Sequence, residues 1–159
     1  MSDCIMCGID SSTTKTGISV FKNGNLEEYM LIDISKEKKE TVKIDKMSLE
    51  ILSKLNTYNP QIVVAELTSM TRNAVTQRTL TMILGVIMSW CLQNNAEYVF
   101  LRASEWRKLI SDEKKPRKRE ELKQWAINTC KALYNIDVTD DVAEAILVAQ
   151  ARINQFKEK

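Results

Sequence analysis

Glu66 is the residue of this sequence whose surroundings most strongly indicate chemistry. It lies near the end of the run QIVVAEL at 61–67, which is short, β-branched and almost continuously apolar. Such a run is typical of a strand buried on both faces. A carboxylate there is costly to bury without a cation or a hydrogen-bond partner. A nearby Lys or Arg would satisfy it, but a divalent metal is the sharper hypothesis, because hard cations prefer carboxylate oxygens.

Three further acids stand at positions where they could join Glu66. Asp10 ends the first predicted strand, and Asp141 and Glu144 lie three residues apart on the last predicted helix, hence on one face. Each has a plain structural alternative, because Asp is common at strand ends and acids in a first helical turn favour the helix dipole. Asp140 fits that alternative better than Asp141, because the apolar residues that follow fix the inward face of the helix.

Taken together, the four acids support a stronger hypothesis than any one of them alone. A first-strand Asp, a central-strand Glu and an acid pair at the start of the last helix can converge at one edge of a mixed sheet. Like charges packed so closely require a metal. Two divalent ions about 3.5–4 Å apart are the usual arrangement for phosphodiester hydrolysis. The acids therefore predict a metal-dependent hydrolytic site.

The hydrophobic pattern predicts one mixed α/β domain over residues 1–159. Asn23-Gly24-Asn25 is a hairpin signal, so the chain should begin with three antiparallel strands. Two more strands then alternate with helices, giving the order β-β-β-α-β-α-β-α-α. Strands are expected at 5–10, 16–22, 29–34, 61–67 and 97–101, and helices at 41–58, 73–93, 118–134 and 140–156.

Composition narrows the classes of function. The 159 residues suit one domain with a sizeable core, and a formal net charge of +2 indicates no partner by itself. With no His in the chain, the usual general base and zinc ligand are missing, so hydrolysis must use carboxylates, metal, Lys or Cys. The C-x-x-C pair at Cys4 and Cys7 has no second pair to complete a zinc site. We interpret the cysteines as free buried thiols of a reducing cytosol.

The apolar segment 80–92 is interrupted only by Thr81, Gly85 and Ser89. At 13 residues it is too short for a bilayer, which needs about 20. No signal peptide is visible, so we expect a cytoplasmic protein (in the host cell cytoplasm if phage-encoded) with no membrane association. A helix that is apolar all round is buried on more than one side. It is either a central core helix or a homodimer interface.

A basic segment at 114–119 is the candidate nucleic-acid contact. Five of its six residues are cations: Lys114, Lys115, Arg117, Lys118 and Arg119. Charges this dense repel one another, so the segment should be exposed. It is either a solvated loop leading into a helix or a loop that binds phosphates.

The ordered motifs resemble those of RuvC-type Holliday-junction resolvases, in their phage-like form, which belong to the ribonuclease H-like superfamily. The matching segments are GIDSS at 8–12 with TG at 16–17, VAE at 64–66 and DVAEA at 141–145. The resemblance runs over residues 4–153. It implies a ribonuclease H-like fold with a mixed five-stranded sheet, three strands antiparallel and then two parallel, and helices on both faces.

The resemblance also implies an activity. The expected function is that of a Mg²⁺-dependent endodeoxyribonuclease that acts as a homodimer on four-way junctions and other branched DNA, including three-way branches. Asp10, Glu66, Asp141 and Glu144 would be the catalytic, metal-binding acids, with two Mg²⁺ per active site and Mn²⁺ able to substitute. The segment 80–92 stands where the family has its dimer interface.

The chain departs from the family at two points. Glu144 replaces the usual final Asp, and no aromatic residue follows Glu66 in the segment LTSM at 67–70. Met70 stands where that aromatic is expected and, with Arg72, is a candidate DNA contact. Recognition should therefore depend on branch shape and backbone charge, with weak sequence preference.

Three other functions compete with this one. The main alternative is a related ribonuclease H-like nuclease for RNA or an RNA–DNA hybrid, because a fold does not settle the substrate. An actin-like or sugar-kinase-like ATPase needs two lobes and a glycine where Ser12 stands. The intact set of acids argues against a catalytically silent DNA-binding module.

Overall fold

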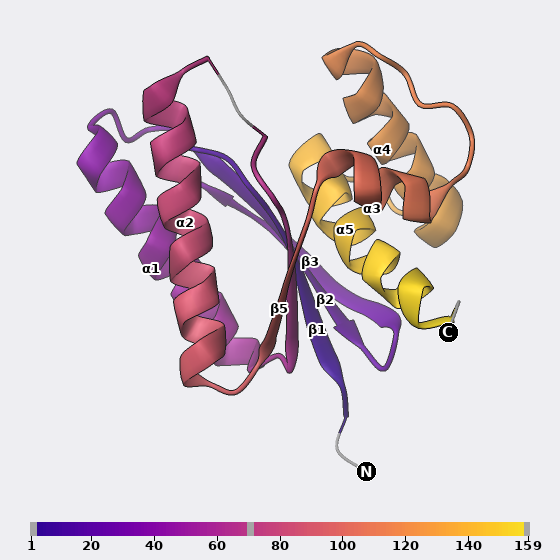
Figure 1. Ribbon diagram of the computed structural model, residues 1–159, viewed down its shortest axis with the longest axis horizontal. Coiled ribbons are helices and arrows are strands. Elements are labelled where there is room, and N and C mark those ends of the chain that lie inside the picture. Colours follow the sequence, from indigo (N-terminus) through magenta and orange to yellow (C-terminus); the bar gives the residue numbers. More distant parts are fainter. Residues whose placement is uncertain (1–2, 70–71, 158–159) are drawn as a thin grey trace.

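The computed structural model describes residues 3–69 and 72–157 as five strands and five helices (Figure 1). The strands are β1 (Ile5–Ser11), β2 (Lys15–Lys22), β3 (Asn25–Asp33), β4 (Ile62–Glu66) and β5 (Glu97–Leu101). The helices are α1 (Glu40–Tyr58), α2 (Ala74–Gln93), α3 (Ala103–Ile110), α4 (Arg119–Tyr134) and α5 (Asp140–Lys157).

The sheet has the strand order β3-β2-β1-β4-β5. Strands β1, β2 and β3 pair antiparallel, whereas β4 pairs parallel to β1 and β5 pairs parallel to β4. Asn23 and Gly24 turn between β2 and β3 with positive φ, as two-residue hairpin turns require. The predicted mixed sheet is confirmed. Its topology puts the carboxyl ends of β1 and β4 side by side.

Helices cover both faces of the sheet, with α1 and α2 on one face and α3, α4 and α5 on the other (Figure 1). Because strand side chains alternate between faces, Cys7 and Ile9 pack toward α1 and α2, whereas Met6 packs toward α5. The same alternation places Asp10 on the α5 face, two residues after Gly8, and Glu66 on that face two residues after Val64.

Helix α5 is the central helix of the fold and lies unusually close to β1 and β2. A Cβ on Gly17 would come within 2.1 Å of the carbonyl oxygen of Asp141, and one on Gly8 within 2.1 Å of the carbonyl oxygen of Ala145. The Ser19 hydroxyl, which is buried, donates to the Ala145 carbonyl at 2.8 Å. The two glycines, which have no side chain, and the hydrogen bond from Ser19 thus fix the first turns of α5 over the sheet.

Three sequence-based expectations need correction. Helix α3 was not predicted, because its eight residues are too few to show a clear period. Cys4 is exposed rather than buried, although all four cysteines are free. Helix α2 has 20 residues, so by length and composition alone it could cross a membrane; a buried core helix meets the same test.

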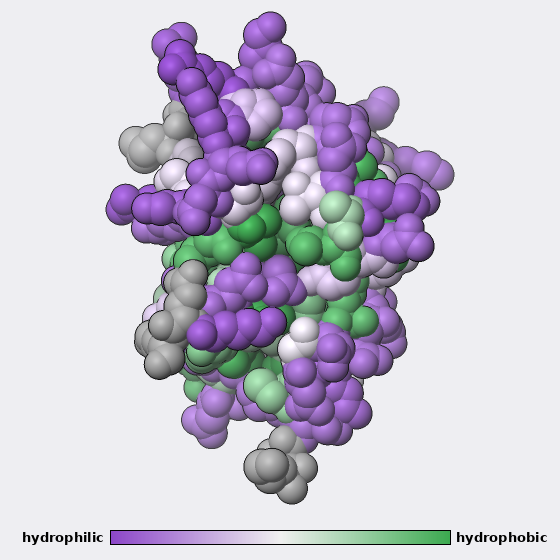
Figure 2. Space-filling view, turned by 90° about the vertical axis from the view of Figure 1, so that its right-hand side faces the viewer, coloured by the Kyte–Doolittle hydropathy of each residue, from purple (hydrophilic) through white to green (hydrophobic). Residues whose placement is uncertain are grey.

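The surface on the side of α4 is mainly hydrophilic (Figure 2). Long hydrophilic side chains extend from most of this face, and hydrophobic surface gathers in a band across its middle (Figure 2). Exposed large apolar residues on α4 and α5 include Leu133 and Phe156.

Candidate metal centre and nucleic-acid interface

Asp10 and Glu66 are brought together by strand register. Ile9 of β1 is paired with Ala65 of β4, so the next residue of each strand is an acid at the same edge of the sheet. Both side chains face α5. The acids therefore lie at the ends of two adjacent parallel strands, where the pairing of β1 with β4 stops.

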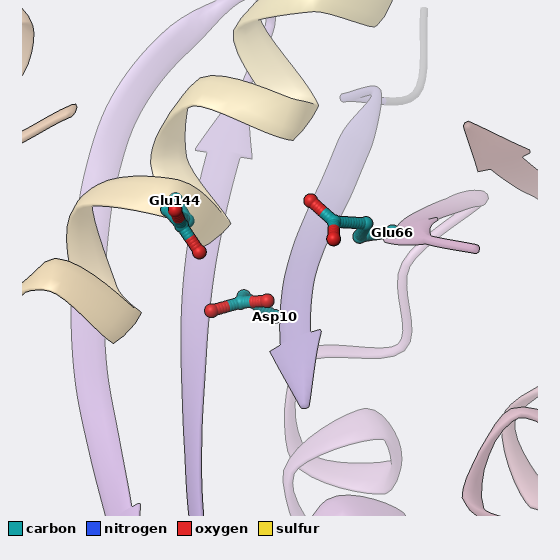
Figure 3. Close-up of side chains that lie close together, drawn as sticks. All are labelled: Asp10, Glu66 and Glu144. Atoms are coloured by element: carbon teal, nitrogen blue, oxygen red, sulfur yellow. The ribbon is translucent and has the colours of Figure 1, made fainter. Parts of the chain in front are cut away.

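Glu144 completes a cluster with these two acids. One carboxylate oxygen from each of Asp10, Glu66 and Glu144 lies within 4.8 Å of the other two. Figure 3 shows the three side chains converging, with Glu144 reaching down from α5. All three are half-buried. Oxygen donors from three separate elements at this spacing are a suitable ligand set for a hard divalent cation.

The electrostatics of the cluster favour a cation. The pKa of Asp10 is well above its ordinary value, first because the carboxyl is buried and then because Glu144, Glu66 and Asp141 carry like charge. Burial followed by the charge of Glu66 also raises the pKa of Glu144, although Arg107 opposes the rise. A side-chain hydrogen bond between the two acids also contributes, because it raises the pKa of Asp10 and lowers that of Glu144.

Asp141 and Asp140 lie beside this cluster rather than within it. Asp141 lines the same cavity and contributes to the raised pKa of Asp10, but it is not one of the three converging carboxylates. Burial and the neighbouring charge of Asp140 raise the pKa of Asp141 itself. Asp140 Oδ2 forms an ion pair with Lys123 Nζ at 2.9 Å.

Helix α3 contributes two residues that sequence reasoning did not assign to the site. The indole Nε1 of Trp106 donates to Glu66 Oε2 at 2.7 Å, and Arg107 Nη2 lies 3.5 Å from Glu144 Oε1. The sequence carries no clear signal for this helix, because Arg102 stands at the N-cap in place of Ser, Thr, Asp or Asn; in the structure the Glu105 carboxylate accepts from the Arg102 backbone N–H at 2.7 Å.

The cluster opens into a cavity of about 600 Å³ whose rim carries cations. Arg117, Arg119 and Lys123 line it together with the acids. A second cavity of about 750 Å³ shares Arg107 and other lining residues with the first. A negative centre surrounded by cations can hold a metal and a phosphodiester at the same time.

The residues of the basic segment 114–119 divide into different environments. Lys114, Arg117, Lys118 and Arg119 are exposed, and of these Arg117 and Arg119 line the acid-containing cavity. Lys115 is half-buried, contrary to the expectation of an exposed segment. Its ammonium donates to the Ser111 and Glu113 carbonyls and lies 5.3 Å from the ring centroid of Trp125. These bonds hold the loop together. Arg72 is exposed, and Met70 lies outside the described residues.

Comparisons with known proteins agree with this architecture. No family model matches the chain. The chain is 26% identical over 151 residues to the crossover junction endodeoxyribonuclease RuvC of Caldicellulosiruptor saccharolyticus, covering 92% of this chain and 90% of that protein. A structure of Thermus thermophilus RuvC with a Holliday-junction substrate superposes with a TM-score of 0.74 and 12% identity, covering 98% of this chain and 96% of that one. The yeast mitochondrial Holliday junction resolvase gives a TM-score of 0.61 and 13% identity, with 96% and 80% covered.

The strand order, the helices on both faces and the likeness to these solved structures show that the chain has the ribonuclease H-like fold. Over nine-tenths of its length the chain is also similar in sequence, at 26% identity, to a RuvC protein.

Proposed function

We propose that this protein is a structure-selective DNA endonuclease, formed by a single nuclease domain, that resolves Holliday junctions and other branched DNA by metal-dependent phosphodiester hydrolysis. The observation that carries the proposal is the convergence of Asp10, Glu66 and Glu144 in a cavity rimmed by cations. The similarity to a crossover junction endodeoxyribonuclease supports the choice of substrate. Four free cysteines are consistent with action in the cytoplasm.

The donor set fits a divalent metal. Three carboxylates with oxygens in mutual reach, and a pKa of Asp10 raised by its neighbours, indicate a site that gains from a bound cation. Asp10, Glu66 and Glu144 would hold it, with Asp141 available from the same cavity for a second ion. We propose two Mg²⁺ per site, with Mn²⁺ as a substitute. Ions bound there would activate water and stabilise the charge that develops on the phosphate.

The cations of the rim would bind and orient the DNA. Arg117, Arg119 and Lys123 reach the cavity from the start of α4 and the loop before it. Their charge attracts phosphates irrespective of base sequence. Lys114, Lys118 and Arg72 would add exposed charge, whereas Lys115 supports the loop through its carbonyl contacts.

Helix α2 supplies the surface that we propose for a homodimer. Its solvent side carries a stripe with alternating spacings of three and four, consisting of Val75, Arg78, Met82, Gly85, Ser89 and Leu92. Val75, Met82 and Leu92 are 46%, 47% and 63% exposed. A Cβ on Gly85 would meet no atom within 4 Å, so a partner helix can approach closely there. This spacing is that of a two-helix seam.

Selection of the substrate should depend on branch shape. Residues 67–69 carry no aromatic side chain that could stack on a base, and α3 and α4 present mainly charged groups to the cavity. Phosphate contacts position the protein but carry no direct sequence information. We therefore propose weak sequence preference and activity that extends to three-way branches.

The test is cleavage of synthetic four-way, three-way and linear DNA and of an RNA–DNA hybrid, with Mg²⁺ or with EDTA. We expect paired nicks in the four-way junction that require the metal. Asp10→Asn and Glu66→Gln should bind the junction in Ca²⁺ yet lose cleavage by about 10²-fold or more. Cleavage of the hybrid with the junction left intact would favour the alternative substrate, and full activity of either variant would refute the metal assignment.

A further inference from the structure

Trp106 is a buried aromatic residue whose only polar atom donates a hydrogen bond to a carboxylate of the proposed metal site. The side chain is fully buried on α3, and its Nε1 donates to Glu66 Oε2 at 2.7 Å. A buried indole N–H usually requires a partner. Here the partner is a carboxylate of the metal-binding cluster, although Trp106 itself does not line the cavity.

The face of the same indole holds a second contact of the cluster. The guanidinium carbon of Arg107 lies 4.9 Å from the Trp106 ring centroid, and Arg107 Nη2 is 3.5 Å from Glu144 Oε1. Cation–π contact restricts the guanidinium to this side of the ring. Trp106 thus contacts Glu66 directly and Glu144 through Arg107.

The chemistry of the donor suits a metal site. Glu has three side-chain torsions, so a carboxylate that must hold a cation gains from a fixed partner. An ammonium or guanidinium would also cancel the negative charge that attracts the cation. The indole N–H is neutral, so it fixes one oxygen of Glu66 and leaves the charge in place. Among residues 3–69 and 72–157, Glu66 forms no ion pair with Lys or Arg.

We propose that Trp106 is a positioning residue of the metal centre: it fixes the Glu66 carboxylate through its N–H and supports Arg107 against Glu144 through its ring. The inference rests on the proposed metal binding and extends it to a residue that touches neither substrate nor metal. Loss of the N–H should weaken the metal site while leaving the DNA-binding surface intact.

The first experiment compares Trp106→Phe with Trp125→Phe by calorimetric titration with Mn²⁺. Phe keeps an aromatic ring at position 106 and removes the N–H. Trp125 is the matched control, because its ring lies 6.2 Å from that of Trp106 and, among residues 3–69 and 72–157, its indole donates no hydrogen bond to the acids. We expect Trp106→Phe to bind Mn²⁺ about 10-fold or more weakly and Trp125→Phe to bind as the wild type does.

Cleavage should separate positioning from general damage. For Trp106→Phe, the Mg²⁺ concentration giving half-maximal junction cleavage should rise by a similar factor, while the rate at saturating Mg²⁺ approaches the wild-type rate. Junction affinity in Ca²⁺ should be unchanged. Wild-type Mn²⁺ affinity in a folded Trp106→Phe would overturn the proposal.

A second measurement needs no substitution at position 106. The three Trp residues give three indole N–H resonances in a nitrogen–proton spectrum; spectra of Trp125→Phe and Trp90→Phe assign two of them, which leaves the third to Trp106. The Trp90 indole donates to Asn56 at 2.7 Å, which makes it an internal control. On titration with Mg²⁺, the Trp106 resonance should shift and saturate with the calorimetric affinity, while that of Trp90 stays in place.

The outcomes distinguish this inference from the proposed function. A Trp106 resonance that stays still while calorimetry records binding overturns the positioning role, as does a wild type that binds no Mn²⁺ at millimolar concentration. A wild type that binds metal with the expected shift but cleaves no branched DNA refutes the proposed function alone.

Discussion

Substitution of Gly17 by Ala should displace the start of α5 and thereby damage the acid cluster. The added Cβ would lie 2.1 Å from the Asp141 oxygen, 2.5 Å from the Asp141 carbonyl carbon and 2.9 Å from the Val142 nitrogen. All three atoms are backbone, so no flexible side chain can move aside. Restoring normal contact requires the first turn of α5 to withdraw by more than about 1 Å.

Two magnitudes follow from that displacement. Overpacking of this kind costs about 1–3 kcal/mol of unfolding free energy. For a chain of this size, each 1 kcal/mol lowers the Tm by about 2–4 °C. A misplacement of about 1 Å in a catalytic site can reduce the rate by about 10²-fold. We therefore expect a folded protein with a lowered Tm, weaker Mn²⁺ binding and a large loss of cleavage.

The assay is thermal unfolding with calorimetric Mn²⁺ titration and single-turnover junction cleavage. Gly85→Ala is the control for metal affinity, because its Cβ would meet no atom within 4 Å. That variant should bind Mn²⁺ as the wild type does. If Gly17→Ala keeps the wild-type Tm and cleavage rate, the close packing of α5 on β2 does not position the acids, and the reasoning is wrong.

Three other predictions test the electrostatics, the DNA contacts and the assembly. Burial and like charges raise the folded-state pKa of Asp10 above its ordinary 3.8, so the metal-free fold loses stability as pH rises from about 4 through that raised pKa. Asp10→Asn removes this loss and should give a higher Tm than the wild type in EDTA at neutral pH. The difference in Tm should shrink on acidification. A lower Tm for Asp10→Asn at pH 7 would contradict this reasoning. Arg117→Ala with Arg119→Ala should weaken binding of all DNA substrates and reduce the slope of log affinity against log salt by about 0.9 per lost contact, whereas Lys131→Ala, whose ammonium pairs with Asp137, should leave the slope unchanged. Met82→Glu should yield monomers in light scattering. Leu133→Glu is the control on α4, because the Leu133 side chain is 54% exposed and that of Met82 is 47% exposed, and it should leave the dimer intact. A wild type that is monomeric at micromolar concentration would refute the α2 interface.

One side of α2 is buried within its own chain, so only substitutions on the other side can test the dimer. Ile87 and Met88 both lie in the apolar segment that suggested an interface, and the sequence offers no reason to separate them. Ile87 is fully buried within its own chain, whereas Met88 is 37% exposed. A charge at Ile87 would therefore test folding and not assembly. The distinction depends on which side of α2 faces α1 and the sheet, and the sequence does not specify that.

The sequence by itself determined the sheet and two of the acids. Alternating and continuous apolar runs mark strands because side-chain direction has a period of two, and the Asn-Gly turn sets the first hairpin. Asp10 and Glu66 could be recognised because each stands where an apolar strand ends. The last helix could be recognised from its long apolar period, and the spacing of three residues between Asp141 and Glu144 puts both on one face of it.

The tertiary structure decided which acids converge and what supports them. Glu144, and not Asp141, joins Asp10 and Glu66 because the missing side chains of Gly8 and Gly17 allow α5 to pack closely against β1 and β2 at these two positions. Contacts between residues about 40 positions apart, such as Trp106 with Glu66, have no local signature in a sequence. The eight residues of α3 are too few to show a period. Local patterns fix elements, but the distances between elements arise only when their side chains pack.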